Sequence, residues 1–162
     1  MSELSDQVEA VLRAKRSKAG GWATNRAATA IMRANVRRDT QPEIRVRRLL
    51  HAAGFRYRVD VAPLREDRRR RADIVFTRVK VAVFIDGCFW HGCPDHFVPP
   101  QANSDYWAVK IARNQERDLE TGERLTAGGW LALRFWEHED PAAVAVAISE
   151  AVTRRRRADR GS

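Results

Sequence analysis

The segment from Val79 to Ile85 constrains the fold of this 162-residue sequence more than any other feature. It is nearly all apolar and rich in β-branched residues, which is typical of a strand buried on both faces of its sheet. Such a strand needs other elements packed against each face. The segment therefore predicts a layered α/β fold.

The remaining elements are predicted from local signals. Thr40 as N-cap, Pro42 in the first turn and Glu43 as the partner in a capping box predict a helix that ends at Gly54. Alternating apolar and basic residues predict a strand over 55–59. We expect further strands over 72–76 and 130–136, and helices over 104–126 and from Pro141 to about Arg155. This order predicts an α/β/α sandwich around a central mixed sheet.

The length fits one domain. We expect a basic, partly flexible arm over residues 1–39, a folded domain over 40–153 and a basic, disordered tail over 154–162. The protein is expected to be a monomer.

Basic residues outnumber acidic ones by 30 to 21, which gives a net charge of +9. This excess predicts a polyanionic partner whose phosphates bind the arm, the run from Arg68 to Arg71 and the tail, although Arg-biased codon usage would give the same composition. No segment has the length and apolarity of a membrane span, and the first twenty residues are too polar for a signal peptide. With two cysteines and no secretory disulfide framework, a cytoplasmic protein with no membrane partner is expected.

Four potential metal ligands occur in and near one loop. Cys88, Cys93 and His96 lie within it, and His138 follows the strand that ends at Trp136. Thiolates and imidazoles are the ligands that Zn²⁺ prefers, and four of them close a tetrahedral structural site. The group predicts a structural zinc loop; the alternative is two small buried thiols beside surface histidines.

Two aspartates accompany the neighbouring strands. Asp73 lies within one apolar strand and Asp86 at the end of the next. In a hairpin, Asp73 would lie close to Asp86 or to the backbone carbonyl of Ile85. Oxygen ligands of this kind suit Mg²⁺, which would neutralise a phosphodiester and activate water. Either aspartate could instead cap a turn.

A proton carrier is also predicted nearby. Nucleases of the restriction type often place a lysine two residues after the second acid, but Cys88 occupies that position here. His91 is then the best candidate, since its ordinary pKa is close to neutrality. Asp118, on the helix over 104–126, would orient the imidazole, and Asn114 lies one turn earlier on the same face.

The pentapeptide Gly87-Cys-Phe-Trp-His91 and its surroundings resemble the very short patch repair (Vsr) endonucleases. The resemblance covers about residues 24 to 140 and extends through Phe76, the strand to Ile85, Asp86 to Cys93, Tyr106-Trp107, Lys110-Ile111, Asn114, Glu116 to Asp118, Gly129-Trp130 and Trp136-Glu137. It implies a restriction-endonuclease-like fold with a structural zinc. It also implies a nuclease that nicks double-stranded DNA 5′ to the T of a T·G mismatch left by deamination of 5-methylcytosine.

Roles for individual residues follow from the same resemblance. Asp73 and the carbonyl of Ile85 correspond to the Mg²⁺ ligands, His91 and Asp118 to the catalytic pair, and Glu43 to an acid near the metal-bound water. Cys88, Cys93, His96 and His138 correspond to the zinc ligands, with His138 in place of a cysteine. The family also has a histidine where Asp86 stands, so Asp86 is expected to bind metal or water instead.

Three residues correspond to the family's contacts with the base stack. Phe89 and Trp90 resemble an aromatic wedge beside the mismatch, and Met32 resembles a residue that intercalates from the arm. A mismatch unstacks at low cost, so an apolar wedge selects it by deformability. Without the resemblance, Phe89 and Trp90 would be interpreted as ordinary core.

The sequence thus predicts a Mg²⁺-dependent mismatch endonuclease that associates with the nucleoid through DNA. Two alternatives stay open on the sequence alone. One is a Vsr-like nicking nuclease without mismatch specificity, acting in defence or beside a restriction system. The other is a non-catalytic, zinc-stabilised DNA-binding module in which Asp73 is structural.

Overall fold

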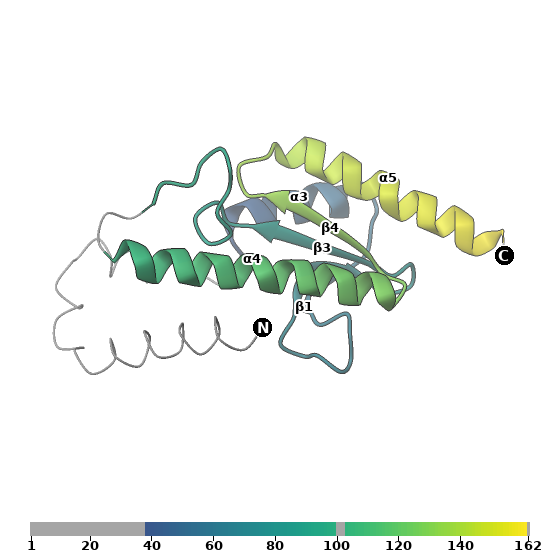
Figure 1. Cartoon of the computed structure of the whole chain (residues 1–162). Helices are drawn as coiled ribbons and strands as arrows, with labels where there is room; N and C mark the ends of the chain where they lie inside the picture. Colours follow the sequence, from purple (N-terminus) through teal and green to yellow (C-terminus); the bar gives the residue numbers. More distant parts are fainter. Residues whose placement is uncertain (1–37, 100–102, 162) are drawn as a thin grey trace. The chain divides into compact units, whose positions relative to one another are not determined.

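The computed structural model describes residues 38–99 and 103–161, which form a four-stranded sheet with helices on both faces (Figure 1). The strands are β1 (Arg58–Val61), β2 (Ala72–Phe76), β3 (Val81–Asp86) and β4 (Leu131–Trp136), and the helices are α3 (Gln41–Ala52), α4 (Ser104–Ala127) and α5 (Pro141–Arg160). This order of elements confirms the prediction. Met32 and most of the expected arm lie outside the described residues.

The sheet is mixed, as predicted. Its strand order is β1-β2-β3-β4; β2 pairs antiparallel with β1 and β3, whereas β3 and β4 are parallel. The carboxyl ends of β3 and β4 therefore lie side by side at one end of the sheet. Because β2 is antiparallel to β3, its first residues lie at that same end, and so does Asp73.

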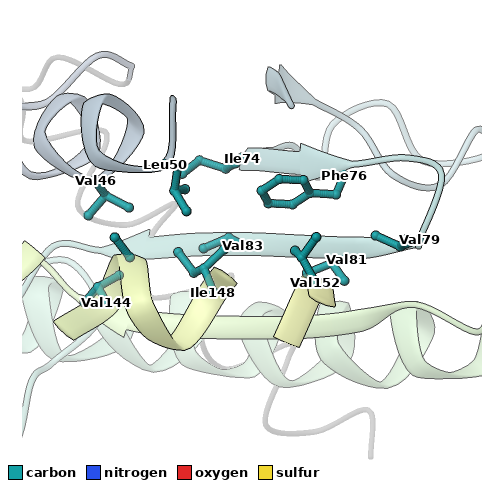
Figure 2. Close-up of a cluster of buried hydrophobic side chains, with 11 residues drawn as sticks. Val46, Leu50, Ile74, Phe76, Val79, Val81, Val83, Val144, Ile148 and Val152 are labelled. Atoms are coloured by element: carbon teal, nitrogen blue, oxygen red, sulfur yellow. The ribbon is translucent and has the colours of Figure 1, made fainter. Parts of the chain in front are cut away.

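The core confirms that β3 is buried on both faces. Val81 and Val83 face Val46 and Leu50 of α3 and Ile148 of α5 (Figure 2). On the other face of the sheet, Ala82 and Phe84 pack with Leu125 of α4. The helices therefore form two layers around the sheet, with α3 and α5 on one side and α4 on the other (Figure 1).

The start of α3 differs from the predicted capping box. The Thr40 side chain accepts no hydrogen bond from the first turn; its hydroxyl donates to Glu43 Oε1 at 2.8 Å. Glu43 Oε2 accepts from the Asp39 backbone N–H at 3.0 Å, one residue before the expected donor. Glu43 therefore accepts from both the Thr40 hydroxyl and the Asp39 N–H, and the reciprocal half of the capping box is absent. The helix ends at Ala52, and Gly54 follows with a φ of +84°.

The first strand begins later than the alternating pattern predicted. Residues 55–57 precede β1 because Phe55 and Tyr57 pack edge-on against the Phe76 ring, with centroid distances of 6.2 and 5.9 Å. The Tyr57 hydroxyl donates to the Arg47 carbonyl at 2.7 Å. Phe55 and Tyr57 therefore pack against the core, although they precede the residues that pair in β1.

We expected residues 154–162 to form a disordered tail. This prediction is wrong for most of these residues, because α5 continues to Arg160. Three contacts stabilise this extension. Arg154 pairs with Glu150 one turn earlier, Arg155 donates to the Gly129 carbonyl at 3.1 Å, and the Arg156 guanidinium lies 5.2 Å from the centre of the Phe55 ring. None of the described helices is long and apolar enough to cross a membrane.

Candidate active site and metal centre

Asp73 lies near the start of β2, with its carboxylate at the end of the sheet where β3 and β4 end. Asp73 Oδ2 accepts a hydrogen bond from the Ile85 N–H at 2.7 Å. Burial raises the pKa of Asp73 to about 7; the Ile85 N–H and Arg47 act against this rise, while the nearby carboxylates of Glu43 and Asp86 add to it. A buried carboxylate with two acidic neighbours is a suitable ligand for a cation.

The backbone of Ile85 faces Asp73. Lys80 and Asp86 direct their carbonyls to β4, where they accept from the N–H groups of Leu131 and Glu137. Carbonyl directions alternate along a strand, so the carbonyl of Ile85 points to the other side, toward β2. Its N–H already donates to Asp73 on that side. Asp73 and the Ile85 carbonyl therefore offer hard oxygen donors side by side, and this donor set fits Mg²⁺.

Glu43 supplies a second buried carboxylate near Asp73, and its side chain is 4% exposed. Both of its oxygens are occupied, by the Asp39 N–H, the Thr40 hydroxyl and Arg47 Nη2 at 3.1 Å. These donors hold the carboxylate in one position. The predicted residues Asp73, Ile85 and Glu43 thus lie together.

His91 and Asp118 are in direct contact, although 27 residues separate them in the sequence. His91 Nδ1 bonds to Asp118 Oδ2, and His91 Nε2 lies 3.8 Å from Asp86 Oδ1. Gln115 donates to the His91 carbonyl at 3.1 Å and Asn114 to the Trp90 carbonyl at 2.8 Å. The face of α4 predicted from the sequence therefore orients the imidazole and fixes the loop that presents it.

Sequence reasoning missed Arg134, which lies at the centre of this group. Its Nε and Nη2 bind the two oxygens of Asp86 at 2.9 and 3.3 Å, and Nη2 also binds Asp118 Oδ1 at 2.9 Å. Burial raises the pKa of Asp86, while Arg134 and His91 act in the opposite direction. Asp86 therefore forms one group with His91 and Asp118, and its effect on Asp73 is the electrostatic one on the pKa. Arg134 is the one charged residue within β4, and this was the signal that could have identified it.

The four predicted zinc ligands converge. Potential ligand atoms of Cys88, Cys93, His96 and His138 all lie within 4.8 Å of one another. Cys88 Sγ is 3.1 Å from His138 Nδ1, and Cys93 Sγ is 3.8 Å from both His96 Nδ1 and His138 Nδ1. Tetrahedral zinc with ordinary bond lengths separates sulfur and nitrogen ligands by about 3.6 Å. The donor set therefore fits Zn²⁺.

Charge also favours a cation at this cluster. Burial, together with the neighbouring Cys93 and Glu137, raises the pKa of the Cys88 thiol to about 12. Glu137, also missed by sequence reasoning, accepts from the Cys88 N–H at 2.7 Å and so joins the loop to the end of β4. Two thiols beside a carboxylate become thiolates readily only when a metal ion compensates their charge.

Phe89 and Trp90 belong to an aromatic group outside the two hydrophobic cores. Their rings meet edge-on with centroids 5.1 Å apart, and each also packs against Trp107 of α4, at 5.2 and 5.7 Å. Lys110 Nζ lies 5.0 Å from the centre of the Trp90 ring. Both residues are half-buried, so they are a surface feature of the loop and of α4 rather than ordinary core.

Comparisons with known proteins identify relatives of this chain. The family profile described as DNA mismatch endonuclease Vsr matches residues 23–95. The type II nicking enzyme V.NaeI of Lentzea aerocolonigenes is 45% identical over 141 residues, covering 86% of this chain and 85% of the relative. V.NmeDIP, a type II nicking enzyme of Neisseria meningitidis serogroup C, is 36% identical over 110 residues, covering 67% and 72%. The DNA mismatch endonuclease Vsr of Escherichia coli K12 is 37% identical over 107 residues, covering 65% and 66%.

Proposed function

Because the chain belongs to the Vsr family and is an endodeoxyribonuclease, we propose that it nicks one strand of duplex DNA, 5′ to the T of a T·G mismatch, in a Mg²⁺-dependent reaction. The observation that supports this most strongly is the contact of His91 with Asp118 at the same end of the sheet as Asp73 and the Ile85 carbonyl. A proton carrier and a set of oxygen ligands thus share one site, as hydrolysis of a phosphodiester requires.

Each residue has a role in this proposal. Asp73 and the Ile85 carbonyl would hold Mg²⁺, which when bound supplies positive charge to the phosphodiester and a water of lowered pKa. Glu43, whose carboxylate is fixed by its three donors, would accept a hydrogen bond from a water molecule at this site. His91 exchanges a proton at Nε2, while Asp118 at Nδ1 holds the ring and its tautomer.

The cysteine–histidine cluster is proposed as a structural Zn²⁺ site. Cys88, Cys93 and His96 come from the loop and His138 from the segment after β4, so the four ligands join two distant parts of the chain. A closed set of four protein ligands leaves no position for substrate. The site therefore serves to hold the loop that bears Phe89, Trp90 and His91.

Mismatch selection is proposed to depend on the aromatic group. Phe89 and Trp90 would enter the base stack, where a T·G pair yields more readily than a matched pair. The Asn114 bond to the Trp90 carbonyl and the adjacent cluster of cysteines and histidines support this role, because a wedge must be rigid to unstack bases. Met32 stays a prediction from the sequence. The partner is double-stranded DNA, bound by a monomer.

A second candidate function is nicking without mismatch preference. It is favoured by Asp86, which stands where the family has a histidine, and by relatives whose names describe type II nicking enzymes. Both candidates share the same hydrolytic site. The non-catalytic module considered above disagrees with the endonucleases to which the chain is related.

The test compares two duplexes that differ only in one base, one with a T·G pair and one with T·A, each labelled on the T strand. With Mg²⁺, the proposal predicts a nick 5′ to the T in the T·G duplex and little cleavage of the T·A duplex. Equal cleavage of both would overturn mismatch selection and favour the second candidate. Absence of cleavage in a zinc-containing preparation would overturn the proposed reaction.

A further inference from the structure

We propose that Arg134 is a positioning residue, which holds Asp118, and through it His91, in the orientation required for proton transfer, with Asp86 as its anchor. This inference rests on the proposed function, since it concerns the same site. It assigns a role to the pair formed by Arg134 and Asp86, in which Asp86 occupies the position of the family's histidine.

The first observation is that both oxygens of Asp118 are occupied. Oδ1 binds Arg134 Nη2 at 2.9 Å and Oδ2 binds His91 Nδ1. A carboxylate held at only one oxygen can rotate about its other bonds, whereas one held at both has a fixed plane. The direction of the His91 ring therefore depends on the position of the Arg134 guanidinium.

The second observation is that the guanidinium is itself fixed. Arg134 lies opposite Phe84 in the parallel pair of β3 and β4, and its guanidinium carbon is 4.7 Å from the centre of the Phe84 ring. Asp86, two residues further along β3, binds Nε and Nη2. The guanidinium is thus held by the Phe84 ring and the Asp86 carboxylate, which both belong to β3. Groups mounted on strands are positioned more exactly than groups mounted on loops.

The third observation concerns charge. Two carboxylates, Asp86 and Asp118, flank His91 from opposite nitrogens, and the side chains of all three are less than 20% exposed. Among the described residues, Arg134 is the cation that contacts both carboxylates. Without it, Asp86 and Asp118 would repel each other across the imidazole. Asp118 would then be free to turn away from His91.

The same contacts argue against a direct role in binding DNA. The Nε and Nη2 atoms of Arg134, which together form one edge suited to a bidentate contact with a phosphate, are already used on Asp86 and Asp118. A phosphate could bind this edge only by displacing a carboxylate. We therefore expect substitution of Arg134 to change the rate of the chemical step more than the affinity for DNA.

The kinetic test compares Arg134→Gln and Arg134→Lys with the wild type. Arg78→Gln, at an exposed residue in the turn between β2 and β3 at the opposite end of the sheet, is the matched control. Arg134→Gln is expected to lower kcat for nicking by about 10- to 100-fold and to change KM by less than about threefold. Arg134→Lys should recover part of the lost kcat, and Arg78→Gln should leave kcat unchanged. A raised KM with an unchanged kcat would overturn the proposal, and so would wild-type kinetics in Arg134→Gln.

Two further measurements test whether Arg134 acts by positioning the imidazole. If Asp86 acts by anchoring Arg134, then Asp86→Asn combined with Arg134→Gln should cost no more in kcat than the larger single effect; additive losses would contradict the anchor. A crystal structure of Arg134→Gln should show the bond between His91 Nδ1 and Asp118 lost or lengthened. An unchanged His91–Asp118 geometry would overturn the inference even if the protein nicks no DNA, so the two proposals can fail separately.

Discussion

At the scale of single residues, Asp73 has a carboxylate whose charge the fold disfavours. Burial and the neighbouring acids Glu43 and Asp86 raise its pKa to about 7, and the Ile85 N–H and Arg47 compensate only in part. A carboxylate whose charged form is destabilised in the absence of a cation, and which lies beside a backbone carbonyl oxygen, is typical of a functional site. The negative charge that Asp73 needs in order to bind a cation therefore lowers the stability of the folded protein.

We therefore predict that Asp73→Asn, which removes this charge, stabilises the protein when Mg²⁺ is omitted. The pKa of Asp73 is higher in the folded than in the unfolded protein, so ionisation costs folding free energy as the pH rises from about 4 to 7. The variant should be more stable by roughly 1–4 kcal/mol at pH 8 and by less than about 1 kcal/mol at pH 4. Asparagine can still accept from the Ile85 N–H.

Urea unfolding of the zinc-containing protein at both pH values would measure this difference, with Asp159→Asn on the exposed end of α5 as the matched control. Asp159→Asn should show no comparable dependence on pH. A loss of stability in Asp73→Asn at pH 8 would contradict the electrostatic account of this residue.

At the scale of elements, the loop over residues 87–98 has no regular structure of its own and is positioned by its neighbours. Gln115 and Asn114 of α4 bind two of its carbonyls, Glu137 binds the Cys88 N–H, and His138 lies against the two cysteines of the loop. The loop is therefore held from α4 on one side and from the end of β4 on the other. Its stability should depend on both attachments.

Gly92 tests the attachment to α4. Its φ is +63°, and a Cβ there would lie 2.8 Å from Gln115 Nε2 and 3.0 Å from Ile111 Cγ2. Gly92→Ala should lower the free energy of unfolding by about 1–3 kcal/mol. Gly122→Ala is the matched control: it lies within α4 with nothing within 4 Å of the added methyl group, and should be neutral or stabilising by up to about 1 kcal/mol. Equal effects in thermal unfolding would contradict this account.

His138 tests the attachment to β4. His138→Ala should lower the bound zinc from one ion per chain and expose the loop to proteases, whereas His51→Ala, on α3 away from the cluster, should do neither. Elemental analysis and limited proteolysis measure the two effects. Full zinc content in His138→Ala would contradict the assignment. So would a zinc-free wild type that keeps its full thermal stability.

At the scale of the whole molecule, the positive charge predicts a strong effect of salt on DNA binding. Within the run Arg68 to Arg71, however, two arginines are already paired: Arg70 with Asp67 and Glu120, and Arg71 with Asp60. Arg68 and Arg69 are exposed and have no ion pair among the described residues. The net charge of the sequence therefore overstates how many arginines are available for phosphates.

This difference can be measured from the dependence of log Kd on log salt concentration. Arg69→Gln should reduce the steepness of this dependence by about one, as expected for a residue that neutralises one phosphate. Arg71→Gln, whose charge Asp60 already balances, should reduce it less. A larger effect of Arg71→Gln would show that the ion pairs open when DNA binds.

The order of helices and strands could be predicted because each has a local signal, such as the apolar segment of β3 or the glycines that end α3 and α4. The convergence of the two cysteines with His96 and His138, and the contact of His91 with Asp118, could be predicted because each set of residue types suits one chemistry. Arg134 was marked in the sequence only as the one charged residue of β4. The partners of Arg134 and of Glu137 could not be predicted, since they are known only once β4 is placed in register with β3. The extension of α5 was missed because its support comes from Phe55 and Gly129, far away in the sequence.

Asp73 is proposed to belong to the site that hydrolyses DNA. The most direct test of this proposal is the single-turnover rate of nicking of a T·G duplex at saturating Mg²⁺ by the wild type, Asp73→Asn and Asp159→Asn. The account predicts a loss of at least about 1,000-fold in Asp73→Asn, with DNA affinity retained, and a wild-type rate in Asp159→Asn. A rate for Asp73→Asn within about tenfold of the wild type would contradict the claim.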